Sequence, residues 1–93
     1  MTILSMVLSS HRLHLIKKVV DNILKGSQVP DRIIINYSNE PFFIDKGINN
    51  RGLTHIDSDI VEYNCVPNFG PMRIVIPMIV EYWDSPETTI IFW

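Results

Sequence analysis

The sequence predicts an α/β fold: part of a doubly wound, Rossmann-like domain with a mostly parallel sheet and flanking helices. Two observations support this prediction. Short apolar runs rich in β-branched residues have the length of buried strands, and between them lie two segments whose hydrophobic residues recur at helical spacing. The resulting order is strand, helix, strand, long loop, strand, helix, strand. Parallel strands joined through a helix have a right-handed crossover, which fixes the hand of each unit.

The first strand–helix–strand unit lies at the start of the sequence. Thr2–Ser9 is a continuous apolar run and predicts the first strand. Hydrophobic residues repeat at helical spacing over Leu13–Leu24, with Ser10 as the expected N-cap and Gly26 as the expected glycine after the helix. Arg32–Tyr37 contains three consecutive isoleucines, which predicts a strand covered on both faces.

A polar middle segment separates this unit from the second one. Asn39–Asp59 is rich in turn-forming residues and reads as a loop, within which Leu53–Ile56 is either a short helix or irregular. Ile60–Val66 is the third strand candidate.

The second unit ends in another apolar run. Asn68–Pro71 is a sharp turn, with Pro71 suited to the first helical position. Helical spacing continues over Val75–Trp83, where we expect Pro77 to kink the helix or to mark its second turn. Thr88–Trp93 then predicts a buried final strand.

The composition fits one small folded domain over residues 1–93, because 46% of the residues are hydrophobic and 19% are charged. A net charge of −2 with eight Lys and Arg supplies no basic surface for nucleic acid. The apolar stretch Ile74–Val80 is too short to span a membrane, and the N-terminal run lacks the features of a signal peptide. We therefore expect a cytoplasmic protein with no membrane span and no nucleic-acid partner.

Three features that often carry chemistry are weak in this sequence. His11 and His14 lack an acidic or Cys partner, which favours a surface pair over a metal site. Asp57 and Asp59 form an Asp-x-Asp pair, but the pair precedes a strand, which favours a solvated loop over a cation site. The lone Cys65 lies in a predicted strand, so we expect a packed core thiol and not a reactive one.

The turn over Asn68–Arg73 is the strongest candidate site. It follows a strand, opens a helix and places Arg73 in the first turn, where backbone N–H groups and a cation favour an anion. An ordinary strand-to-helix turn with a proline at its first position accounts for the same residues equally well.

Four segments carry a family resemblance by their order and spacing: Leu13–Leu24, Pro30–Ile35 (Pro-Asp-Arg-Ile-Ile-Ile), Asn68–Pro77 (Asn-Phe-Gly-Pro-Met-Arg-Ile-Val-Ile-Pro) and Thr89–Phe92 (Thr-Ile-Ile-Phe). Together they resemble the N-terminal half of a GT-A-fold glycosyltransferase, closest to the group with a Gly-Pro-x-x-Lys-Leu-x-Pro-like segment. The resemblance implies binding of a nucleoside-diphosphate sugar, and a last strand placed beside the first.

The resemblance also implies a set of nucleotide-binding residues: Ser9, Ser10, Arg12, Asn68, Gly70, Pro71 and Arg73. Those after the first strand would face the base and ribose, and those after the third would line the nucleotide side of the cleft. Ile74 stands where the family has its lysine, so Arg73 would be the main diphosphate contact.

In that family an acidic motif just beyond the last strand holds Mn²⁺ or Mg²⁺ on the diphosphate. The sequence stops at Trp93, before that position. We therefore expect no metal in this chain except together with a missing C-terminal half, and no transferase turnover by the chain alone.

Two alternatives remain open. One is a non-catalytic remnant or interaction module of the same fold, which would associate with itself or with the missing half through Thr88–Trp93. The other is a small flavodoxin-like or receiver-like binding domain.

Overall fold

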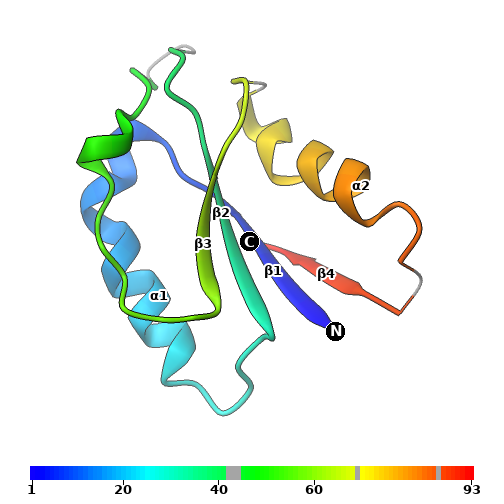
Figure 1. Ribbon diagram of the computed structural model, residues 1–93. Coiled ribbons are helices and arrows are strands. Elements are labelled where there is room, and N and C mark those ends of the chain that lie inside the picture. The colour runs from blue at the N-terminus through cyan, green and yellow to red at the C-terminus, as the bar shows by residue number, and fades with distance from the viewer. Residues whose placement is uncertain (42–44, 69, 86) are drawn as a thin grey trace.

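The computed structural model describes residues 1–41, 45–68, 70–85 and 87–93, and it confirms the α/β fold. The described residues form a four-stranded, all-parallel sheet with the order β3-β2-β1-β4 (Figure 1). The elements are β1 (Thr2–Val7), the 3-10 helix η1 (Ser10–Leu15), α1 (Ile16–Leu24), β2 (Arg32–Tyr37), the 3-10 helix η2 (Asn50–Gly52), β3 (Val61–Cys65), the 3-10 helix η3 (Gly70–Ile74), α2 (Ile76–Tyr82) and β4 (Thr89–Phe92).

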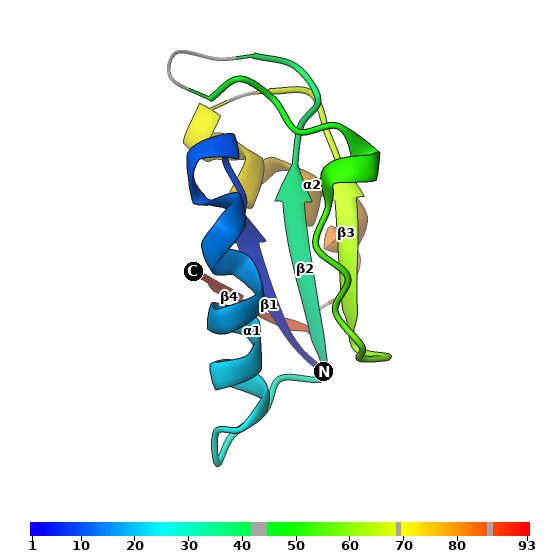
Figure 2. The same ribbon diagram turned by 90° about the vertical axis from the view of Figure 1, so that its left-hand side faces the viewer.

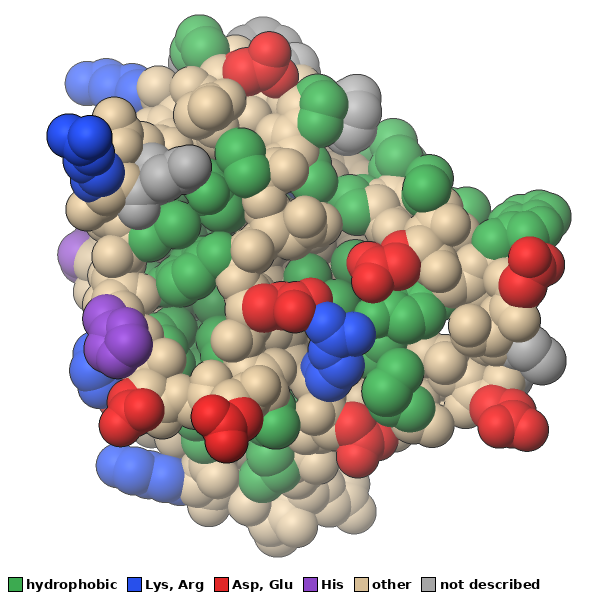
Figure 3. Space-filling view, viewed as in Figure 1, with side chains coloured by type: hydrophobic (Ala, Val, Ile, Leu, Met, Phe, Trp, Pro, Cys, Tyr) green, Lys and Arg blue, Asp and Glu red, His purple; other side chains and the backbone are tan. Residues whose placement is uncertain are grey.

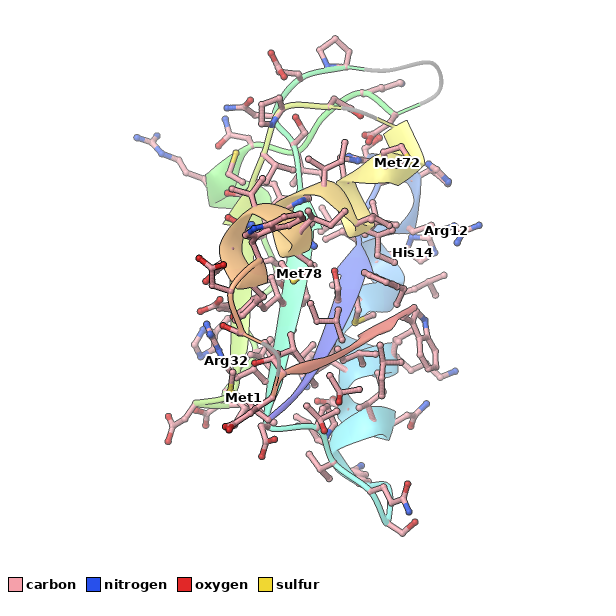
Figure 4. The ribbon with its side chains drawn as sticks, turned by 90° about the vertical axis from the view of Figure 1, so that its right-hand side faces the viewer. Met1, Arg12, His14, Arg32, Met72 and Met78 are labelled. Carbon is pink, nitrogen blue, oxygen red and sulfur yellow. The ribbon has the colours of Figure 1, made fainter. Side chains whose placement is uncertain are left out.

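The two α-helices lie on opposite faces of the sheet, as Figures 1 and 2 show together. β2 is an inner strand, and its isoleucines are buried on both sides as their sequence predicted. Ile33 and Ile35 join the larger core with Val20 of α1, whereas Ile34 packs with Met78 of α2 in a second cluster. Figure 4 shows Met78 where α2 crosses the sheet.

β1 is the other inner strand, and it lies between β2 and β4. Leu4 is level with Ile33 on one side and with Ile91 on the other. The last strand therefore lies beside the first, as expected. All four strands run parallel, so the loops that follow β1, β2 and β3 gather at one edge of the sheet (Figure 1).

The first helical segment begins differently from its prediction. A 3-10 turn precedes α1, and Ser9, not Ser10, is the residue before it. The prediction of Ser10 as N-cap was wrong because both polar groups of Ser10 bond to the loop after β2, through Asp45 and Lys46. Gly26 directly follows the C-cap of α1, as predicted.

The second helical segment is divided in two. η3 follows the turn after β3, and Pro77 lies in the first turn of α2, where its missing N–H leaves no helical hydrogen bond unmade. The segment is thus interrupted directly before Pro77, in line with the expected kink or second turn at this proline. Leu53–Ile56 is irregular, and a short 3-10 helix, η2, lies directly before it.

β4 is much more exposed than its apolar sequence predicted. Ile91 and Phe92 are each 48% exposed and Trp93 is 64% exposed. The prediction of a buried strand was wrong for two reasons. Within the described residues β4 pairs only with β1, and α1 packs over β1, β2 and β3, leaving the β4 side chains on that face uncovered.

The other edge strand gives a second correction. Cys65, predicted to be a packed core thiol, is exposed. It is the last residue of β3, which pairs with β2 alone among the described residues, and no residue of this strand is fully buried.

Several apolar side chains lie exposed on and just after α2. Ile79, Val80 and Trp83 are exposed, and hydrophobic side chains gather on the right of Figure 3, where α2 lies. In the described ranges we find no helix with the length and hydrophobicity needed to cross a membrane.

Candidate functional site

The candidate site is a polar cluster where three loops meet at the carboxyl edge of the sheet. Ser9 follows β1, Asp45 belongs to the loop after β2, and Arg73 lies in η3 after β3. Figure 1 shows these connections converging at the upper end of the sheet. The carboxyl edge is where open α/β sheets place their ligands, and parallel strands bring these distant residues together.

Arg73 is the centre of the cluster. Its guanidinium donates through Nε to the Gly70 carbonyl at 2.9 Å, through NH1 to Asp45 Oδ2 at 2.9 Å, and through NH2 to Ser9 Oγ at 3.2 Å. The side chains of Arg73 and Asp45 are only 4% and 6% exposed. The cation that the sequence assigned to a diphosphate is thus held inside the protein by a carboxylate.

The Asp45 carboxylate accepts hydrogen bonds from three loops. Oδ1 accepts the backbone N–H of Ser10 at 3.1 Å and that of Gly47 at 3.0 Å, while Oδ2 accepts Arg73. Burial by itself would raise the pKa of Asp45, but the two backbone N–H groups and the Arg73 guanidinium together lower it below its ordinary value. Asp45 is therefore ionised at neutral pH.

Ser10 fastens the loop after β2 to the start of η1. Its amide bonds Asp45, and its hydroxyl accepts the backbone N–H of Lys46 at 2.8 Å. A few residues on, the amide of Ile48 donates to the carbonyl of Ser38 at 2.8 Å, and Ile48 is buried in the larger core. These bonds hold Asp45 over the carboxyl edge.

Asn68 shapes the turn before η3. Its Oδ1 accepts the Gly70 amide at 3.0 Å, which closes an Asx turn. Its own amide donates to Glu40 Oε1 at 3.0 Å, and its Nδ2 donates to the Glu40 carbonyl at 2.8 Å and, at 3.5 Å, approaches Asp45 Oδ2. Gly70 has a φ of +64°, a conformation suited to glycine.

A buried polar ladder lies below the cluster, inside the sheet. Asn36 donates from Nδ2 to Ser5 Oγ at 3.0 Å and accepts from Asn64 Nδ2 at 3.0 Å. Ser5 in turn donates to the carbonyl of Ile74 at 2.7 Å. The ladder links β1, β2 and β3 to the end of η3 and so fixes the segment that carries Arg73.

The structure brings together most of the predicted site residues. Ser9, Ser10, Asn68, Gly70 and Arg73 all take part in the cluster. Arg12 does not: it is exposed, and Figure 4 shows it projecting outward from η1, away from the sheet.

Pro71 lies in η3, and its side chain is outside the part of the chain that the structure describes.

Two residues of the cluster escaped the sequence analysis. Asp45 and Glu40 both lie in the polar segment Asn39–Asp59, where a carboxylate usually faces water. A usable signal was the Asp-x-Gly spacing of Asp45 and Gly47 after a buried strand, since it favours an Asx turn at the carboxyl edge.

The weaker candidates stay at the surface. His11, His14, Asp57 and Asp59 are all exposed. Across the described ranges no three His, Cys, Asp or Glu side chains come together in a way that could hold a metal ion.

A separate hollow of about 650 Å³ lies toward the opposite end of the sheet, between α1 and β4. Its wall includes Ile23 from the end of α1, Gly26 and Val29 from the following turn, Ile91 from β4, and Trp93 after it. It is mostly apolar and has no member in common with the Arg73 cluster.

The cluster has the groups to bind an anion, but the Asp45 carboxylate already occupies that position. Arg73 supplies a forked guanidinium, suited to a carboxylate or a phosphate. Asp45 neutralises it, and within the described residues every buried side-chain nitrogen and oxygen has a hydrogen-bond partner.

No family model, curated protein or solved structure matches this chain.

Proposed function

We propose that this chain is the nucleotide-sugar-binding part of a glycosyltransferase-like protein, and that the diphosphate binds at the Arg73 cluster. The observation that supports the proposal is the convergence of Ser9, Ser10, Asn68 and Arg73 at the carboxyl edge. These four are among the residues that the family resemblance assigns to the nucleotide, and they follow β1 and β3.

The division of labour follows from the chemistry of each group. Arg73 is the cation for the diphosphate, since guanidinium matches phosphate oxygens with two parallel N–H groups. Beside Arg73, Asn68 is held in place by its bonds to the Glu40 carbonyl and the Gly70 amide. Metal ligands are not part of the proposal for this chain, which covers binding of the sugar nucleotide and not transfer.

A calorimetric comparison tests the proposal. Uridine and guanosine diphosphates and their sugar esters are titrated into the protein, with and without Mn²⁺, and compared with inorganic pyrophosphate. We expect a nucleoside diphosphate to bind more tightly than pyrophosphate, because the base and ribose add contacts. Equal or weaker binding of every nucleotide would overturn the nucleotide assignment.

A conservative variant tests the role of Arg73. Arg73→Lys keeps the charge but loses the fork, so nucleotide affinity should fall by about tenfold. Arg51→Lys is the matched control, because Arg51 is exposed on η2, outside the cluster. Equal affinities for the two variants would contradict the proposal.

The second candidate is an interaction module that pairs through β4. The amides of Thr89 and Trp93 donate to the carbonyls of Met1, just before β1, and of Ser5 in β1. The alternate amides of Ile90 and Phe92 therefore point toward the outer edge. No strand in the described part of the chain pairs with that edge. An exposed apolar edge strand is a template for adding another strand.

Amide hydrogen exchange tests this candidate. We expect the Ile90 and Phe92 amides to exchange fast in dilute solution and to become protected as the protein concentration rises. Fast exchange at every concentration would show that the edge stays free, and slow exchange even at high dilution would show that the edge is covered within one chain.

A further inference from the structure

The surroundings of the Asp45 carboxylate have the composition of an anion-binding site. The guanidinium of Arg73 lies 2.9 Å from one oxygen, and the backbone amides of Ser10 and Gly47 lie 3.1 and 3.0 Å from the other. The side-chain amide of Asn68 approaches at 3.5 Å. A forked cation with converging backbone and side-chain N–H groups is also what a phosphate oxygen requires.

The charge balance makes Asp45 a competitor for that position. Asp45 neutralises Arg73, and Glu40 adds a further negative charge on the other side of Asn68. While Asp45 stays in place, an incoming phosphate therefore meets a cluster of net negative charge. Binding of a phosphate to Arg73 requires the Asp45 carboxylate to leave.

Arg73 and the backbone beside Asp45 are held by different hydrogen bonds. Arg73 is fixed by η3 and by the ladder below it, through the Ile74 carbonyl. Asp45 belongs to a loop, held by the hydrogen bond between Lys46 and Ser10 and by that between Ile48 and Ser38. Turning the Asp45 side chain away would free Arg73 while the backbone bonds of Lys46 and Ile48 stay in place.

We infer that the Asp45 carboxylate occupies the position of a ligand phosphate, and that a ligand bearing a diphosphate binds Arg73 by displacing Asp45. The choice of diphosphate rests on the proposed function; the displacement rests on the contacts of Asp45 alone. Asp45 is thus an internal competitor that sets how tightly the site binds anions. On displacement the amide of Ser10, now bonded to Asp45, becomes available to the ligand.

The direct test uses inorganic pyrophosphate and Asp45→Asn. This substitution keeps the side-chain shape but removes the competing charge, so pyrophosphate should bind at least about tenfold more tightly than to the parent chain. Asp59→Asn is the matched control: it makes the same chemical change at an exposed position before β3, and its affinity should equal that of the parent. Equal affinity in all three proteins, or no binding by any, would overturn the inference.

A measurement on the unaltered chain covers the case in which Asp45→Asn fails to fold. Saturating pyrophosphate should move the NMR amide signals of Ser10 and Gly47, because both lose their bond to Asp45. The amides of Gly52 and Asp59, remote from the cluster, should stay in place. Unmoved signals for Ser10 and Gly47 at saturation would overturn displacement.

The outcomes separate this inference from the proposed function. If Asp45→Asn gains affinity for pyrophosphate while no nucleoside diphosphate binds more tightly than pyrophosphate, Asp45 is a competitor in an anion site that is not a nucleotide site. If nucleotides bind the parent chain with the Ser10 and Gly47 signals unmoved, the nucleotide assignment stands and displacement is wrong.

Discussion

The Asp45 carboxylate and the Arg73 guanidinium form a buried ion pair, 2.9 Å from oxygen to nitrogen, between residues 28 positions apart in the sequence. The pair joins the loop after β2 to the 3-10 helix after β3. Buried ion pairs of this kind add little stability compared with apolar packing, but loss of one partner leaves the other charge uncompensated. Replacing either residue of the pair should therefore lower the stability of the fold.

We expect Arg73→Met to lower the free energy of unfolding by about 3–5 kcal/mol, because it leaves Asp45 buried without its cation. Arg32→Met is the control. Arg32 pairs with Glu62 at a partly exposed position, so its loss should lower the free energy of unfolding by at most about 1 kcal/mol. Urea denaturation measures both. Similar values for the two variants would show that burial of the Arg73 pair carries no special weight.

Acid should remove the contribution of Asp45. Its pKa is lower in the folded chain than in the unfolded one, so Asp45 stabilises the fold above the ordinary aspartate pKa of about 3.9, and this stabilisation is lost as the pH falls through the folded value. The difference in unfolding free energy between the parent and Asp45→Asn should shrink as the pH drops below about 4. Urea denaturation across this pH range, with sucrose added to favour the folded state, measures this difference in unfolding free energy. A constant difference down to pH 2 would contradict the expectation.

Gly47 should resist substitution. Its φ is +80°, and a Cβ there would lie 2.6 Å from the Asn39 carbonyl oxygen. Gly47→Ala should therefore destabilise the chain by about 1–3 kcal/mol. Gly52→Ala provides the comparison, because nothing lies within 4 Å of its added carbon. Thermal unfolding followed by circular dichroism measures both, and a Gly47→Ala protein as stable as Gly52→Ala would count against this backbone geometry.

A charge on β4 should suppress self-association. Ile91 is 48% exposed on the edge strand, and a lysine on an edge strand disfavours pairing with another strand. Ile91→Lys should shift the sedimentation profile toward monomer at high micromolar protein concentration. Leu15→Lys is the control, since Leu15 is 44% exposed on η1. A parent chain that is already monomeric at that concentration would remove the basis for association through β4.

Much of the architecture was predictable from local pattern. The isoleucines of Arg32–Tyr37 indicated a strand buried on both faces, and β2 is such a strand. The order of strands and helices implied a parallel sheet, which places the residues after β1 and β3 at one edge. The meeting of Ser9 with Asn68–Arg73 followed from that order, because parallel strands all end on the same side.

The pairing of Asp45 with Arg73 was beyond the reach of the sequence pattern. The residue lies in a polar loop whose composition is that of solvated surface. Its burial depends on how the loop crosses the carboxyl edge, where Ser10 and Arg73 fix its carboxylate. No periodicity in the sequence records a pairing between residues that meet only after the strands align.

Ile33 and Ile91 differ in burial although both lie in apolar strands. Local composition was enough to place both residues in β-branched apolar strands. The tertiary structure alone decided that Ile33 is fully buried and Ile91 about half exposed. Ile33 has a strand on each side and packs in the core with α1, whereas within the described residues β4 has one neighbouring strand and lies beside α1, not beneath it. The side chain is the same, but its burial is a property of its neighbours.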